Sequence, residues 1–144
     1  MSITRTQARD EMMAVVNTAL TGYDASFDIL WEDDDSKRRP KDRTPYAVVG
    51  VYHVAGTQTA FGTEGASRQR KFTRYGYIEV LVHTPEGDGF TLADNLATIV
   101  HDALEGTTTT GGVIFRNVRA VEGGKSGSFR VTNVTADFEY DQTR

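Results

Sequence analysis

The sequence predicts an α+β domain, in which a mainly antiparallel sheet packs two helices on one face and carries a long loop or hairpin arm. Two observations predict this class. Five stretches have the alternating or continuously apolar pattern of strands, and two longer stretches have the 3.6-residue period of helices. The strands come in runs rather than alternating with helices, which favours α+β over a parallel α/β sheet. A chain of 144 residues is most simply one domain, spanning 1–144.

The segment Arg74–Gly106 reads as a strand, a tight polar turn and a helix. Ile78, Val80 and Val82 alternate with more polar neighbours, which is typical of a strand with one buried face. After the turn at 85–89 the apolar period lengthens to that of a helix. The helical stripe consists of Leu92, Leu96, Ile99, Val100, Ala103 and Leu104.

The ends of both helices are also predicted. In the helix after the turn, Asp88 or Thr91 is the expected N-cap, and Gly106 stands where a C′ glycine belongs. The first helix is predicted over Thr4–Leu20, with a capping box from Thr4 to Gln7, and it ends at Gly22. Its apolar face consists of Met12, Met13, Val16, Ala19 and Leu20.

The remaining strands are predicted from alternation and turn residues. Ser26–Glu32 is a short strand, and Tyr46–Val54 is the best candidate for the central strand because both of its faces are mostly apolar. Val113–Val121 and Phe129–Tyr140 form an antiparallel hairpin with the glycine-rich connection 123–127. In the last strand Val134, Ala136, Phe138 and Tyr140 share one face, and Asp137 and Glu139 point away.

Two segments do not fit a simple strand or helix. Residues 33–45 form a charged loop that contains Pro40 and Pro45. Residues 55–72 leave four alternatives open: a disordered loop, an extended hairpin, a lid or a partner-binding arm. Their glycines, threonines and single aromatic residue, Phe61, favour an extended arm or hairpin over a helix.

Composition excludes several classes of protein. The chain has no cysteine, so disulfides, zinc–thiolate sites and cysteine nucleophiles are excluded. Its formal charge of −4 excludes a uniformly basic nucleic-acid binder. No apolar run approaches the ~20 residues that span a bilayer, and the first residues lack the apolar core of a signal peptide. We therefore expect a soluble, unprocessed protein with no membrane partner.

No motif for catalysis, cofactor binding or metal binding is recognisable. His53 and His83 are placed to become neighbours across paired strands, but we interpret both as polar residues on half-solvated strand faces, and His101 as part of a solvated helix face. The acidic run 33–35 lacks the spacing of a calcium loop and is interpreted as solvated. We therefore expect a non-enzyme with no catalytic residues, no cofactor and no metal.

The most informative feature is the distribution of charge. After its acidic start at 33–35, the loop holds five basic residues against Asp42, and four more basic residues stand at the base of the arm, so each of these two stretches carries a formal +4. Such concentrations favour a neighbouring anionic surface, either DNA or an acidic protein that includes a second copy of this chain. The alternative is that loops are simply where charges are solvated. The residues are Lys37, Arg38, Arg39, Lys41 and Arg43 in the loop, and Arg68, Arg70, Lys71 and Arg74 in the arm.

Four phrases, in this order and spacing, resemble the tail terminator proteins of long-tailed bacteriophages. They are FDILWED after the first helix, PYAVVGVYH after the loop, GYIEVLVHTPEGDGFTLADNLATIVHDALEG, and the closing RVTNVTADFEYD. Together they cover nearly the whole chain, and the third is the most specific. The charged loop and the arm have no matching segment in the family.

The resemblance implies a structural virion protein without catalytic activity. It implies a homohexameric ring at the head-proximal end of the tail, assembled in the host cytoplasm. The ring would cap the tail tube, stop its polymerisation, and join the major tail tube protein on one face to a head-completion or neck protein on the other. DNA would pass through the bore without sequence-specific binding.

Two rival functions remain open at this point. One is a head–tail connector or head-closure subunit of the neck, and the other is a small DNA-binding module that uses the basic loops. For the ring, we expect the basic residues of both segments to lie at subunit or tube interfaces, with Phe61 as a buried anchor.

Overall fold

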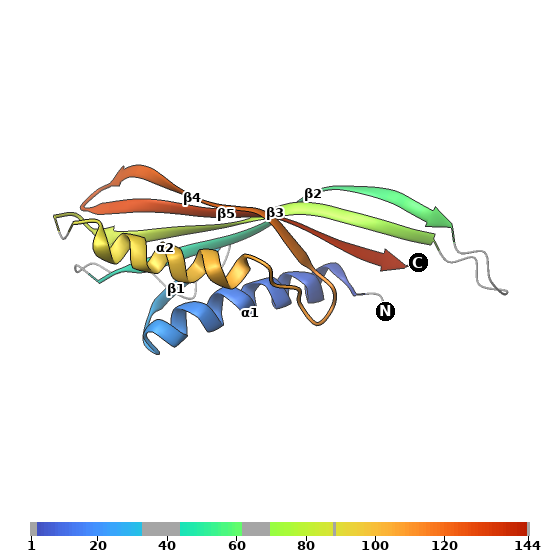
Figure 1. Cartoon of the computed structure of the whole chain (residues 1–144), viewed down its shortest axis with the longest axis horizontal. Coiled ribbons are helices and arrows are strands. Elements are labelled where there is room, and N and C mark those ends of the chain that lie inside the picture. The colour runs from blue at the N-terminus through green and yellow to red at the C-terminus, as the bar shows by residue number, and fades with distance from the viewer. Residues whose placement is uncertain (1–2, 33–43, 62–69, 88, 144) are drawn as a thin grey trace.

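The computed structural model describes residues 3–32, 44–61, 70–87 and 89–143. Within them the sheet has five strands in the order β1-β2-β3-β5-β4, so β3 is central (Figure 1). The elements in chain order are α1 (Arg5–Tyr23), β1 (Asp28–Trp31), β2 (Tyr46–Phe61), β3 (Arg70–Pro85), α2 (Thr91–Leu104), β4 (Ile114–Ser126) and β5 (Phe129–Thr143).

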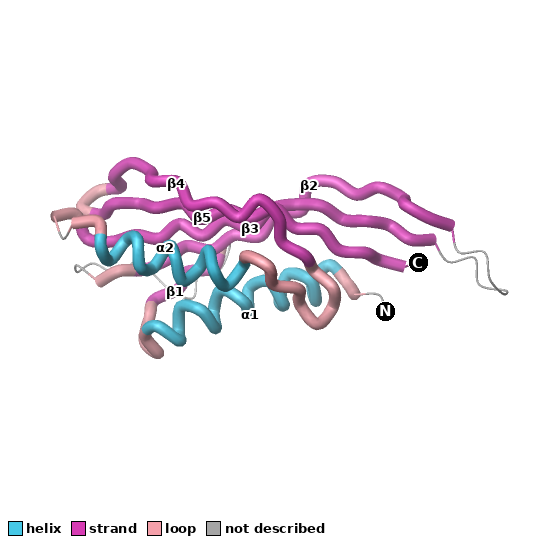
Figure 2. Tube along the Cα trace, viewed as in Figure 1, coloured by secondary structure: helices cyan, strands magenta, loops and turns pink. Residues whose placement is uncertain are grey.

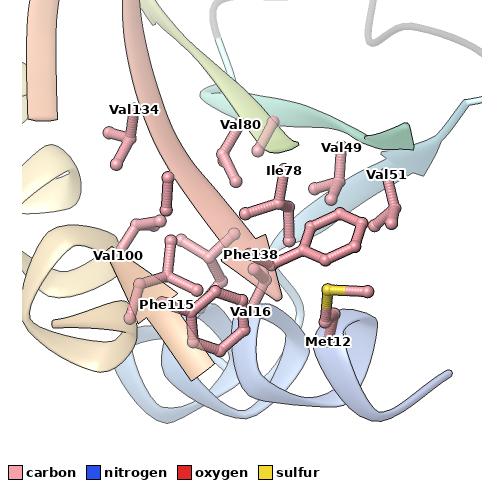
Figure 3. Packing of buried hydrophobic residues seen from close by; sticks show 14 of the residues in the cluster. Met12, Val16, Val49, Val51, Ile78, Val80, Val100, Phe115, Val134 and Phe138 are labelled. Atoms are coloured by element: carbon pink, nitrogen blue, oxygen red, sulfur yellow. The ribbon is translucent and has the colours of Figure 1, made fainter. Parts of the chain in front are cut away.

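Both helices cover the same face of the sheet, which confirms the predicted α+β class (Figure 1). The core lies between them because alternate residues of each strand point to this side. Ile78, Val80 and Val82 of β3 are fully buried there, as their alternation predicted. Figure 3 shows how side chains from the strands meet Met12 and Val16 of α1 and Val100 of α2.

The prediction that Tyr46–Val54 forms the central strand is wrong, because β2 lies between β3 and the short edge strand β1. Its second apolar face has another cause. On the side of the sheet away from the helices, Tyr46 and Val48 pack with Leu30 and Phe129 in a separate small cluster. A strand beside the edge therefore has two apolar faces at one end without being central.

The pair β1–β2 is parallel, whereas β2–β3, β3–β5 and β4–β5 are antiparallel. A parallel connection has to return the chain to the end of the sheet where β1 began. The returning segment contains the predicted charged loop, of which residues 33–43 lie outside the described part of the chain.

The helix ends match the sequence at some positions only. The capping box of Thr4 and Gln7 is present, but α1 continues through Gly22 to Tyr23. Gly106 follows the C-cap of α2 with φ 72°, the left-handed backbone that favours glycine. Thr91 does not cap α2: Phe90 is the N-cap and supplies no side-chain hydrogen bond. Asp88 lies outside the described residues.

The hairpin of β4 and β5 is confirmed, but its turn is shorter than the predicted connection 123–127. β4 runs to Ser126, and Gly127 with φ 62° begins a two-residue turn. Gly123 and Gly124 lie where the register shifts between Glu122 and Lys125, so a bulge accommodates them within the strand. β5 likewise extends beyond the predicted Tyr140, to Thr143.

The packing predicts a clear difference between two identical substitutions. Val80 is fully buried and Val121 is 56% exposed. We expect Val80→Ala to lower the free energy of unfolding by about 2 kcal/mol, because it removes buried methyl groups and leaves a cavity. Val121→Ala should change it by less than about 0.5 kcal/mol. Urea denaturation measures both, and equal effects would contradict the assigned core face.

Candidate assembly surface

The predicted arm is an extended hairpin, one of the four alternatives that the sequence left open. β2 and β3 remain paired from Gly56↔Arg74 to Phe61↔Arg70, and β5 runs beside β3 as far as Lys71↔Thr143. These three strands project past the helices (Figure 2). The hairpin is not a separate arm, since β2 continues through Val54, where the sequence placed its end. Residues 62–69 lie outside the described part of the chain.

Within the described part of the chain, most of the outer edge of β2 has no strand paired with it. β1 pairs only with residues 46–49 of this strand, and Arg9 then donates from Nη2 to the Val51 carbonyl oxygen at 3.3 Å. Beyond that point no other strand pairs with this edge among the described residues. Residues 52–61 contain no Asp, Glu, Lys or Arg. An edge without charged side chains is available for strand addition.

The opposite edge of the sheet, β4, is built differently. It carries Arg116, Arg119, Glu122 and Lys125, and its register with β5 shifts at two places. Asn117 has a positive φ of 52°. Charges and bulges are the features by which proteins prevent unwanted strand pairing. The open edge for strand addition is therefore that of β2.

The predicted interface residues separate into two groups. Three of these residues, Arg70, Lys71 and Arg74, lie at the start of β3. Because side chains alternate between the two faces of a strand, Lys71 lies on the opposite face from the two arginines. The Lys71 ammonium forms an ion pair with Asp141 at 3.0 Å. Phe61 ends β2, and its side chain lies outside what the structure describes. Lys37, Arg38, Arg39, Lys41, Arg43 and Arg68 also lie outside the described residues.

Arg74 lies in a pocket at the base of the hairpin that sequence reasoning missed. The pocket has a volume of about 610 Å³, and its wall includes Arg5 at the start of α1, His53 on β2 and Tyr140 on β5. Arg74 donates from Nε to Gln142 Oε1 at 2.9 Å. No role was predicted from the sequence for Arg5 or for Arg9, one helical turn later. Their i, i+4 spacing was the available signal, because it places two cations on one side of the helix.

Two glycines make room for these side chains. Gly76 pairs with His53 on one side and with Phe138 on the other. A Cβ at Gly76 would overlap the Phe138 ring and the Tyr52 carbonyl oxygen, so its absence lets the histidine and phenylalanine rings meet at 5.1 Å. In the next row Gly56 pairs with Arg74, and a Cβ there would lie 2.5 Å from Arg74 Nη1.

The pocket determines the hydrogen bonding and the pKa of His53. Its Nε2 lies 2.7 Å from the Tyr140 hydroxyl, and its buried Nδ1 has no hydrogen-bond partner among the described residues. Burial lowers the pKa of His53 to about 4, with help from the positive charges of Arg5, Arg9 and Arg74. Burial also raises the pKa of Tyr140, so the phenol stays protonated. At neutral pH the wall of the pocket therefore contains a neutral imidazole and the two cations Arg5 and Arg74, and the charge of Arg9 also acts on that imidazole.

The idea that His53 and His83 are neighbours is wrong. His83 pairs with Tyr46 and stacks on its ring at 4.3 Å, on the face of the sheet opposite the helices. Strand alternation and register place the two histidines on different faces. His101, on α2, lies near Asp102 and Glu105. Within the described residues no group of three His, Cys, Asp or Glu side chains is arranged to hold a metal.

No family model and no curated protein matches this chain. Solved structures do match it. One of them aligns with a TM-score of 0.67 at 15% sequence identity, over 95% of this chain and 95% of its own. At that identity the similarity shows a shared fold and nothing more. No described helix is both long and apolar enough to span a membrane.

The lowered pKa of His53 predicts how stability depends on pH. Because the folded-state pKa of about 4 lies below the ordinary value of 6.5, protonation favours the unfolded chain. The contribution of His53 to stability is therefore fully present above about pH 6.5 and is lost as the pH falls toward 4. We expect His53→Gln to reduce the loss of unfolding free energy between pH 7 and pH 5. Urea denaturation at both values tests this, and an unchanged slope would contradict it.

Proposed function

We propose that this protein is a structural virion subunit that forms a ring on the end of a phage tail tube, stops its polymerisation and offers a surface for joining the head. The observation that supports this best is the three-stranded end of the sheet, where the β2 edge is uncharged and pairs with no other strand among the residues that the structure describes. The order of the four sequence phrases that resemble tail terminators supports it independently. The proposal assigns no catalytic role to any residue.

The open edge of β2 suits association between identical chains. An extended segment of a neighbour adds to such an edge through main-chain hydrogen bonds, which do not depend on a particular sequence. The partner segment differs from the β2 edge itself, because a head-to-tail contact joins two different surfaces. Such contacts close into a ring when the rotation between subunits closes, and a closed ring leaves no free surface for further growth.

Charge is proposed to set the orientation of the subunit on its partners. Arg70 and Lys71 stand at the projecting end of the hairpin, in a protein whose formal charge is −4. Basic side chains at a rim mainly raise association rates and select the register of binding. The proposed partners are a second copy of this chain, the tail tube protein and a head-completion or neck protein, with DNA passing through the bore at the head-proximal end of the tail.

One experiment separates this proposal from its rivals. The purified protein is examined by native mass spectrometry and negative-stain imaging, with and without tail tubes. Hexameric rings at tube ends are the expected result. Rings that do not bind tubes but bind the neck complex would favour a head–tail connector. A monomer that ignores tubes and binds duplex DNA, with an affinity that falls steeply with salt, would favour a DNA-binding module and overturn the proposal.

Shortening the hairpin tests its role directly. Deleting residues 57–70 joins Gly56 to Lys71 and leaves 71–73 as a three-residue loop next to the pair Gly56↔Arg74. Since the helices cover only the remaining part of the sheet, we expect the body to stay folded while ring formation and tube capping are lost. Circular dichroism checks the fold, and mass measurement checks the ring. A folded deletion variant that still forms capping rings would show that the hairpin has no role in assembly.

Reversing the charges of the arm tests the electrostatic part. The triple variant Arg68→Glu, Arg70→Glu and Lys71→Glu should assemble more weakly than the unmodified protein at low salt. The difference should shrink near 1 M salt, where the screening length falls to about 3 Å. The matched control, Arg116→Glu with Arg119→Glu and Lys125→Glu on β4, changes the net charge equally and should keep assembly. Sedimentation at several salt concentrations measures both, and equal behaviour would remove the electrostatic argument.

A further inference from the structure

The pocket at the base of the hairpin concentrates positive charge without compensation. Arg5 and Arg74 line it, and the charge of Arg9 acts on the same histidine. Across residues 3–32, 44–61, 70–87 and 89–143, no carboxylate forms an ion pair with any of these three arginines. Arg9 and Arg74 donate to uncharged oxygens of Val51 and Gln142, and the Arg74 guanidinium also lies over the Phe72 ring, 5.2 Å from its centroid. Like charges one helical turn apart destabilise a helix unless an anion lies nearby.

The start of α1 adds to this positive potential. Thr4 and Arg5 line the pocket, so the N-terminal end of a 19-residue helix lies at its wall. The first turn contains no acidic residue that would offset the positive end of the helix dipole. The capping box already pairs the Thr4 and Gln7 N–H groups, so the contribution of this helix end is mainly the positive potential of its dipole. The positive potential in the pocket is therefore raised by the helix end, by the two arginines of α1 and by Arg74 of β3.

His53 and Tyr140 supply further polar groups in the same wall. When the Tyr140 hydroxyl donates to His53 Nε2, the ring proton resides on Nδ1, the buried nitrogen that has no partner. A buried donor without a partner is costly. Ile3, Val54 and Ala55 complete the wall, so the pocket combines convergent donors with a partly apolar lining.

We propose that this pocket binds an oxyanion, a phosphate or carboxylate group, through the guanidinium groups of Arg5 and Arg74. Guanidinium is the side-chain group whose geometry matches these oxyanions best. Gly56 is a positioning residue in this site, because a side chain there would collide with the Arg74 guanidinium. The site belongs to the single chain, so it does not depend on the proposed ring.

The oxyanion has two possible sources, and the arms of one experiment separate them. The first arm titrates the full chain with inorganic phosphate at constant ionic strength, set with sodium chloride, and follows the His53 ring signals by NMR. A bound anion stabilises the imidazolium, so phosphate should raise the His53 pKa from about 4. The double variant Arg5→Gln, Arg74→Gln should bind phosphate at least about tenfold more weakly. This result identifies a free anion as the ligand.

The second arm asks whether a carboxylate of a second copy fills the pocket. In that case phosphate has no effect on the dilute chain, and the double variant self-associates at least about tenfold more weakly than the unmodified protein. The matched control for both arms is Arg116→Gln with Arg119→Gln, which should behave as the unmodified protein. Gly56→Ala should weaken the interaction with both arginines still present, which separates the geometry of the site from its net charge.

The proposal is overturned if phosphate leaves the His53 pKa unchanged and the double variant self-associates normally. It is also overturned if the control variant loses the same binding, because the effect would then be one of net charge. Circular dichroism of each variant confirms that it is folded. Ring formation and tube capping are measured separately. A monomer that binds phosphate would support this pocket while contradicting the proposed ring.

Discussion

The structure depends on the packing of two helices against one face of a sheet whose strands are much longer than the helices. A helix rises about 1.5 Å per residue, so the 19 residues of α1 span about 28 Å. A strand rises about 3.3 Å per residue, so the 16 residues of β2 or β3 span about 53 Å. The helices therefore cannot cover the sheet from end to end. The uncovered end is the projecting group of β2, β3 and β5.

This mismatch explains how the side chains change along one face. In the covered part Val51, Ile78 and Ala136 are buried beneath the helices. Toward the uncovered end the same face carries His53 and then Arg74, because polar groups are tolerated where water reaches them. Between the two parts the rings of His53 and Phe138 meet above Gly76 and close the core. The boundary of the core is thus also the wall of the cationic pocket.

The same mismatch connects the fold with the proposed function. A sheet that is covered throughout and closed at both edges has little main chain to offer a partner. Here β1 stops at Trp31, and from residue 52 onward no strand of the described part of the chain pairs with the outer edge of β2. β4, the other edge, has charges and bulges that discourage pairing. A subunit with one protected and one open edge presents two different surfaces, and a head-to-tail contact requires two different surfaces.

Local patterns predicted those parts of the molecule that depend on neighbours along the chain. The alternation that buries Ile78 and Val82 on one face, the helical stripe through Leu96 and the capping box of Thr4 all appear in the structure, because each follows from backbone geometry over a few residues. The predictions failed where a strand was expected to end at weakly apolar residues. Val54 lies at a bulge, and β2 continues because β3 pairs with it regardless of side-chain polarity.

The sequence by itself therefore determined the class of fold and the buried faces of the helices and strands. It also determined the position of the hairpin in the chain, between the second and third strands. Only the tertiary structure decided the parallel pairing of β1, the central place of β3 and the separation of His53 from His83. It alone brought Arg5 of the first helix and Arg74 of β3 into the wall of one pocket. These features follow from strand order and register, which join residues far apart in the chain, and no local pattern of side chains specifies which distant segments become neighbours.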